Sequence, residues 1–249
     1  MAWLGALAIG LSLGMLGSGG SILTVPVLIF LVGESEKVAI AESLAIVGGI
    51  AMVGSLPFAF RRLVAWRSVV FFGIPGMAGA YLGAALSRYV SGAFQLTFFA
   101  IIMLVAAVLM FRPPAVPRAS AEASQRASWK IGIDGLLVGM LTGFVGVGGG
   151  FLIVPALVLL GGLPMHLAVG TSLTIIALKS FTGFAKYLDV LASIGLAVNW
   201  PLIAMFTLIG AFGTLLGNWL GGRLPQQRLR EVFAAFLVVM GAFVLYTSL

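Results

Sequence analysis

Charged residues are scarce in this chain. Only 8% of its 249 residues are Asp, Glu, Lys or Arg, whereas 61% are hydrophobic; an ordinary soluble domain is about one quarter charged. Its 14 basic and 7 acidic side chains are too few to cover a water-soluble protein of this size. Most apolar residues must therefore face lipid or other helices. The composition excludes a soluble globular protein and predicts an all-α integral membrane protein.

Cysteine is absent, and the chain holds a single histidine. Without Cys there can be no disulfide framework and no thiolate metal site. One His without a cluster of buried carboxylates leaves few candidates for acid–base or metal chemistry, so we expect no enzyme activity, no cofactor and no metal. No GxxxxGK[ST] motif occurs, which argues against direct use of ATP. The net charge of +7 is spread between apolar runs, so nucleic acid is not an expected partner.

The hydrophobic residues form eight apolar stretches, which predict about eight membrane segments. Six are close to the roughly 20 residues that one helix needs to cross a bilayer. The other two, 2–33 and 131–162, would reach about 50 Å as straight helices, well beyond a hydrocarbon core of about 30 Å. The stretches are 2–33, 38–60, 68–87, 93–111, 131–162, 164–185, 194–222 and 231–248.

Both overlong stretches carry a glycine cluster near the middle. Gly17, Gly19 and Gly20 lie in the first, and Gly146 and Gly148–Gly150 lie in the second. Glycine is the poorest helix former after proline, so each first helix is expected to break there or to form a re-entrant hairpin.

The two clusters belong to an internal repeat. Residues 10–47 align with 139–176 without a gap, and 15 of the 38 positions are identical. After a five-residue shift, Trp66 aligns with Trp200, and three glycines and a leucine that follow it align as well. The chain is therefore predicted to hold two homologous membrane halves, 1–111 and 131–249, joined by a cytoplasmic linker at 112–130. Duplicated halves with matching broken helices are typical of secondary transporters.

The basic residues indicate how the halves are oriented. Three segments, 61–67, 112–130 and 223–230, contain ten of the fourteen Lys and Arg. If all three are cytoplasmic, the two overlong stretches must each return to the side from which they entered. This interpretation predicts inverted repeats with both termini outside. Two parallel four-helix repeats with kinked first helices remain the alternative.

Two motifs resemble a known family. GVGGGFLIVPAL at 146–157 is followed by AVGTSL at 168–173, and a degenerate copy, GSGGSILTVPVL at 17–28, is followed by AIAESL at 39–44. Together they resemble the sulfite exporter TauE/SafE family of bacterial inner-membrane transporters, over nearly the whole chain. The resemblance implies a multi-pass protein of the bacterial inner membrane that moves sulfite, sulfonates or related anions. The first copy departs from the pattern at three residues, Ser18, Ser21 and Glu42. Glu42 aligns with Thr171 of the second copy.

The expected binding site lies where the two broken helices meet. Short helices that begin after the breaks would direct unpaired amide groups at a small anion. Alternatively, the glycines serve helix packing, the hydroxyl groups bond their own helices, and Lys179 extends its head group to an interface. Glu42, near the outer end of its span, is expected to be solvated, with a proton carrier as the alternative. The predicted substrate-binding residues are Gly17, Ser18, Gly19, Gly20, Ser21, Ser43, Gly146, Gly148, Gly149, Gly150, Thr171, Ser172 and Lys179.

These features predict a secondary transporter that moves a small sulfur-containing anion by alternating access. A coupling proton or sodium ion and the surrounding bilayer are its expected partners. The alternatives are an anion channel that uses the same hairpins and a transporter of another small organic anion.

Overall fold

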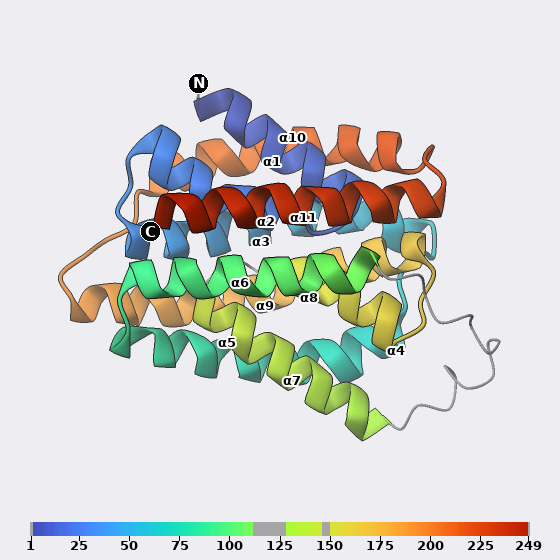
Figure 1. Ribbon diagram of the computed structural model, residues 1–249, viewed down its shortest axis with the longest axis horizontal. Helices are drawn as coiled ribbons and strands as arrows, with labels where there is room; N and C mark the ends of the chain where they lie inside the picture. Colours follow the sequence, from blue (N-terminus) through green and yellow to red (C-terminus); the bar gives the residue numbers. More distant parts are fainter. Residues whose placement is uncertain (1, 112–127, 146–149, 249) are drawn as a thin grey trace.

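The computed structural model describes residues 2–111, 128–145 and 150–248 (Figure 1). The elements of these residues are all helical, as the composition predicts, and none is a strand. The first part contains α1 (Ala2–Leu16), α2 (Gly19–Val27), the π-helical η1 (Leu28–Val32), α3 (Glu36–Phe60), α4 (Trp66–Ser68), the π-helical η2 (Val69–Gly73), α5 (Ile74–Leu86), the 3₁₀ turn η3 (Ser87–Tyr89) and α6 (Gly92–Phe111). The second part contains α7 (Ser128–Val145), α8 (Gly150–Pro155), the π-helical η5 (Ala156–Leu160), α9 (Met165–Ser193), α10 (Trp200–Gly221) and α11 (Gln226–Ser248).

Five stretches of the described chain are long and apolar enough to cross a membrane. Shorter apolar helices cover Ala2–Leu16, Gly19–Val32 and Glu231–Tyr246. Helix α9 continues past the predicted end at 185 to Ser193. The predicted linker, 112–130, lies mostly outside the described residues. The crossing helices are Glu36–Phe60, Trp66–Tyr89, Gly92–Leu109, Met165–Ser193 and Trp200–Gly221.

The first overlong stretch is broken where the glycines predict. Helix α1 ends at Leu16 and α2 begins at Gly19. Helix α2 then packs back along α1: a Cβ on Gly20 would lie 2.2 Å from the Ile9 carbonyl oxygen, and one on Gly5 would lie 2.8 Å from Val27 Cγ1. The chain therefore doubles back at this point. The break predicted at the corresponding glycines of the second stretch falls at 146–149, which lie outside the described residues.

The two halves are interleaved in space. Helix α1 packs against α10, and α5 packs against α7, so the first helix of each half lies on a late helix of the other. Both interfaces rely on glycine: a Cβ on Gly10 would lie 2.1 Å from the Gly210 carbonyl oxygen, and one on Gly139 would lie 2.2 Å from that of Gly76. Small residues allow this backbone approach. The pairs α3–α9 and α6–α11 also join the halves.

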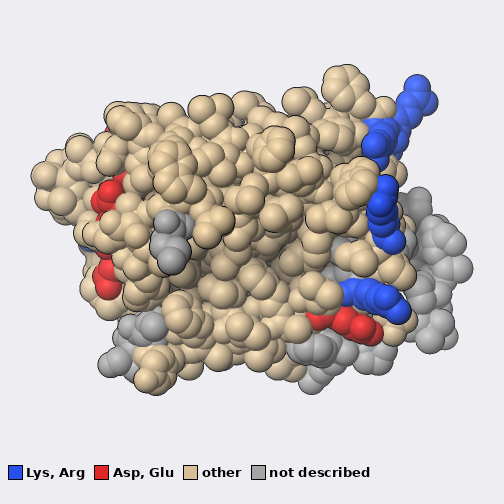
Figure 2. Space-filling model, turned by 90° about the horizontal axis from the view of Figure 1, so that it is seen from above, with Lys and Arg blue, Asp and Glu red and all other residues tan. Residues whose placement is uncertain are grey.

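Charges gather at the two ends of the helices. In Figure 1 both chain termini lie at the left, and α4 and the turn between α10 and α11 lie at the right. The face seen in Figure 2 is free of charge along most of its length, with basic side chains at the right-hand end. Between the ends the surface is apolar; Leu208 and Phe212, for example, are 73% and 62% exposed. Such a surface suits a lipid environment.

Candidate functional site

The tip of the first hairpin lies against the second half of the chain. Gly17, between α1 and α2, has φ +72°, a conformation that glycine adopts without strain. Its carbonyl oxygen accepts a hydrogen bond from the Ser172 hydroxyl of α9, with an O···O distance of 2.9 Å. A Cβ here would lie 2.8 Å from Ser172 Oγ and from Val169 Cα. Gly17 and Ser172, both predicted site residues, are thus in direct contact.

The start of α8 meets the same hairpin tip. A Cβ on Gly150 would lie 2.8 Å from Ser18 Cβ and 2.6 Å from Ile176 Cδ1. Ser18 precedes α2 and is fully buried, and its hydroxyl oxygen has no hydrogen-bond partner among the described residues. Ser18 and Gly150, both predicted site residues, therefore lie side by side. Gly146, Gly148 and Gly149 lie outside the described residues.

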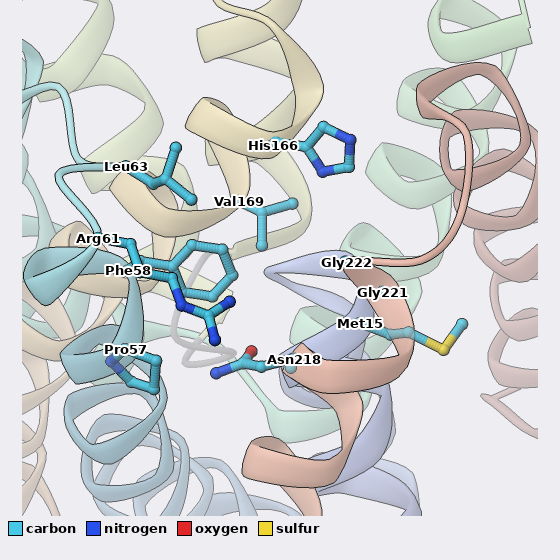
Figure 3. Close-up of a pocket in the computed structure, with 11 residues that line it drawn as sticks. Met15, Pro57, Phe58, Arg61, Leu63, His166, Val169, Asn218, Gly221 and Gly222 are labelled. Carbon is cyan, nitrogen blue, oxygen red and sulfur yellow. The ribbon is translucent and has the colours of Figure 1, made fainter.

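A cavity of about 290 Å³ reaches this region from the end that carries most basic side chains (Figure 3). Its walls come from α1, α3, α9, α10 and the turn after α3. Arg61 and Asn218 point toward each other across it, and His166 lies on another wall. Val169, which packs against Gly17, also lines it. The cavity thus places a guanidinium, an imidazole and an amide along an approach to the hairpin tip.

The equivalent region at the opposite end is closed by hydrogen bonds. Tyr187 donates to the Phe144 carbonyl at 3.0 Å, and Gln95 donates to both that carbonyl and the Tyr187 hydroxyl. Lys37 donates to Gln95 Oε1 at 2.5 Å and to the Ser87 carbonyl at 2.6 Å. This outer network, Lys37, Ser87, Gln95, Phe144 and Tyr187, joins five elements.

The repeat register relates the outer network to the cavity. The 129-residue offset extends over the first three helices of each half. It pairs three network residues, Phe144, Tyr187 and Lys37, with Met15, Phe58 and His166, respectively. The 134-residue offset pairs Gly221 with Ser87. The four residues that the repeat pairs with network residues all line the cavity: Met15, Phe58, His166 and Gly221. Equivalent positions therefore enclose a cavity at one end and are bonded together at the other.

Lys179 lies deep in α9 with 2% of its surface exposed. Its ammonium group donates to Thr142 Oγ1 of α7 at 2.8 Å, and a Cβ on Gly76 of α5 would lie 3.2 Å from Lys179 Cδ. The head group therefore stays inside the bundle and does not extend to an interface. In the repeat, Ile50 occupies the position of Lys179 and Leu13 that of Thr142, so this polar pair exists in one half only.

The remaining predicted site residues are buried but bond to their own surroundings. Ser21 donates to the Ser18 carbonyl and Ser43 to the Ile40 carbonyl. Thr171 donates to the Leu167 carbonyl and accepts the Ala65 amide at 2.9 Å. The other two, Gly19 and Gly20, pack against α1.

The expectation that Glu42 is solvated is wrong. The residue is fully buried, and its Oε1 accepts the backbone amide of Asn199 at 2.7 Å. A position near the end of an apolar run suggested exposure, but α10 begins directly over this side chain and covers it. The repeat could have indicated this contact, because Glu42 aligns with Thr171. In the structure the Thr171 side chain accepts the backbone amide of Ala65, the residue equivalent to Asn199.

Comparison with known proteins finds membrane transporters that match nearly the whole chain. A profile of the sulfite exporter TauE/SafE family matches residues 2–244. The chain belongs to this family. A probable membrane transporter protein of Xylella fastidiosa (strain Temecula1 / ATCC 700964) is 34% identical over 96% of this chain and 92% of its own. The probable membrane transporter protein YunE of Bacillus subtilis (strain 168) is 30% identical over 94% and 93%. No solved structure matches the chain.

Membership of the TauE/SafE family, together with the apolar helices, makes this a multi-pass membrane protein of a transporter family. It also agrees with the expectation of a transporter and not an enzyme. Arg61, Asn218 and the outer network were not among the predicted site residues. Arg61 belongs to a basic cluster that served only to orient the chain, and Gln95 and Tyr187 are brought together by tertiary packing alone.

Proposed function

We propose that this TauE/SafE protein is a secondary transporter that moves a small sulfur-containing anion, such as sulfite or a sulfonate, by alternating access in a bacterial inner membrane. The observation that carries the proposal is the contrast between repeat-equivalent positions: they enclose a cavity at one end and form the outer network at the other. A carrier must adopt such an asymmetric state, and its mirror image, to expose one site to each side in turn.

The proposal includes inverted repeats and eight membrane segments. In Figure 1, α1 starts at the left with the N-terminus and α11 ends at the left with the C-terminus. Helix α7 starts from the opposite side, at the lower right. The cavity opens at the end that carries Arg61, Arg67 and Arg223, which the charge rule assigns to the cytoplasm. The two hairpins would then enter from opposite sides and meet at Ser18 and Gly150.

The chemistry of the meeting point suits a small oxyanion. The first amides of an α-helix such as α2 have no carbonyl partner in a preceding turn, although that of Ser21 donates to the Ser18 carbonyl at 3.2 Å, and the helix dipole favours negative charge at this end. The Ser18 hydroxyl is buried beside them and has no described partner. Arg61 lies along the cavity, and its guanidinium would raise the local concentration of anions. The buried amino group of Lys179 would supply a further positive charge within the bundle when it is protonated.

Flux measurements test the proposal. The purified protein in liposomes should take up sulfite or a sulfonate at a rate that saturates with concentration, and anion loaded inside should accelerate uptake from outside. Protein-free liposomes and a Gly132→Ala variant are matched controls, because a Cβ on Gly132 would meet its nearest neighbours only at 3.7 Å. Failure to move any of sulfite, sulfonate, sulfate or small carboxylate anions would refute the transport function.

The anion channel is the second candidate. A channel would use the same buried amides, but its flux would neither saturate in the carrier range nor show acceleration by anion on the far side. The outer network favours the carrier, because hydrogen bonds among Lys37, Gln95, Phe144 and Tyr187 hold the opposite end together. Non-saturating flux without exchange would favour the channel.

A further inference from the structure

Glu42 is a fully buried carboxyl group with one oxygen unused. Its Oε1 accepts the Asn199 amide at 2.7 Å, whereas Oε2 has no hydrogen-bond partner among the described residues. A carboxylate sealed from water needs a cation or several donors to remain ionised at low cost. One backbone amide and the nearby N-terminus of α10 are the donors that the structure provides.

The repeat shows that the structural task at this position does not need a carboxyl group. In the second half, Thr171 occupies the position of Glu42 and accepts the Ala65 amide at 2.9 Å. Ala65 and Asn199 are themselves equivalent, one residue before Trp66 and Trp200. A hydroxyl group therefore makes the same cap in the other half. The cap therefore requires neither the second carboxyl oxygen of Glu42 nor its negative charge.

No described cation pairs with Glu42. Helices α1, α2 and α10, which pack around α3, contain no Asp, Glu, Lys, Arg or His. Lys37 is held by Ser87 and Gln95, and Lys179 by Thr142. Lys186 pairs with Asp189, and Glu34, in the turn before α3, acts on Glu42 as a like charge. The other titratable groups of α3 and α9 are Glu36, His166 and Tyr187.

We propose that Glu42 is a proton-binding site whose protonation accompanies closure of the end of the molecule that holds the outer network. The inference rests on the proposed alternating-access function. In the state seen here the carboxyl is sealed and the cavity is open at the other end. Opening of the sealed end would expose Glu42 to water, where it loses its proton. Low pH on that side therefore favours the state with the open cavity.

The absence of Cys allows a direct test without knowledge of the anion. A single Leu63→Cys substitution places a thiol in the wall of the cavity, and its labelling rate with a charged thiol reagent reports how often the cavity is open. The same rate is measured in Leu63→Cys combined with Glu42→Thr or Glu42→Gln. The ratio of the two rates cancels the pH dependence of the thiol itself. Threonine retains the cap, as Thr171 does, and glutamine retains the shape of the side chain.

We expect the labelling rate of the protein with Glu42, divided by that of either variant, to fall at least about fivefold as the pH rises from about 5 to about 8. One proton linked to a two-state change shifts the equilibrium between the two states by up to about tenfold per pH unit. A constant ratio would overturn the assignment. If neither variant folds, a bulky reagent on the Leu63→Cys thiol is used to hold the cavity open in the protein with Glu42. A pH dye then measures proton uptake on this reaction, and no uptake would equally overturn the assignment. Absence of anion flux, by contrast, refutes only the transport function.

Discussion

Gly139 on α7 faces α5 at a distance that leaves no room for a side chain. A Cβ there would lie 2.2 Å from the Gly76 carbonyl oxygen and 2.8 Å from Gly76 Cα. Both are backbone atoms, so relief requires the helices to separate. Ordinary contact begins at 3.4 Å, and a Gly139→Ala substitution therefore calls for a displacement of about 1.2 Å. Overpacking of this kind costs about 1–3 kcal/mol of the free energy of unfolding.

Gly132→Ala is the matched control, on the same helix seven residues earlier. Its Cβ would meet Phe71 O and Pro75 Cγ at 3.7 Å, which is ordinary contact. Both substitutions gain the same helix propensity of up to about 1 kcal/mol, so the difference between them isolates the packing cost. Thermal unfolding in detergent should place the Tm of Gly139→Ala about 2–12 °C below that of Gly132→Ala. Equal Tm values would refute the close α5–α7 contact.

Three further predictions concern the site. Gly150→Val should reduce anion flux at least about tenfold while the protein still inserts, because its side chain would displace Ser18 and Ile176; normal flux would remove the site from the hairpin tip. Lys179→Met should weaken anion binding about tenfold, equivalent to about 1.4 kcal/mol, with an unchanged or raised Tm because an apolar side chain of similar length replaces a buried amino group; unchanged affinity in a titration would contradict this role. Reporters active on one side only should place both termini outside, and a cytoplasmic C-terminus would contradict the inverted arrangement.

The main features of the fold follow from local patterns. Apolar run length determines which segments can cross a bilayer, because the hydrocarbon core has a fixed thickness. The excess length of 2–33 and its glycines predict the break that the structure places between Leu16 and Gly19. The repeat register predicts which residues are equivalent, and the equivalent caps at Ala65 and Asn199 agree with that register.

The burial of individual polar residues does not follow from such patterns. Glu42 lies near the end of its apolar run, where the sequence favours solvent, yet the start of α10 covers it. Lys179 has an interface within reach along its own helix, but Thr142 on α7 binds its head group. In both residues the deciding partner is more than thirty positions away in the chain.

By itself, the sequence determined the solvent, the helical class, the two related halves and the position of the first break. Each of these depends on composition, run length or identity between two aligned stretches of the sequence, none of which requires knowledge of which helices touch. Only the tertiary structure decided that α1 packs on α10 and α5 on α7, that Gly17 meets Ser172, and that one end holds a cavity while its counterpart is bonded shut. These contacts depend on which helix faces pack together. The helices are distant in the chain and similar in hydrophobicity, so the sequence pattern does not indicate which of them pair.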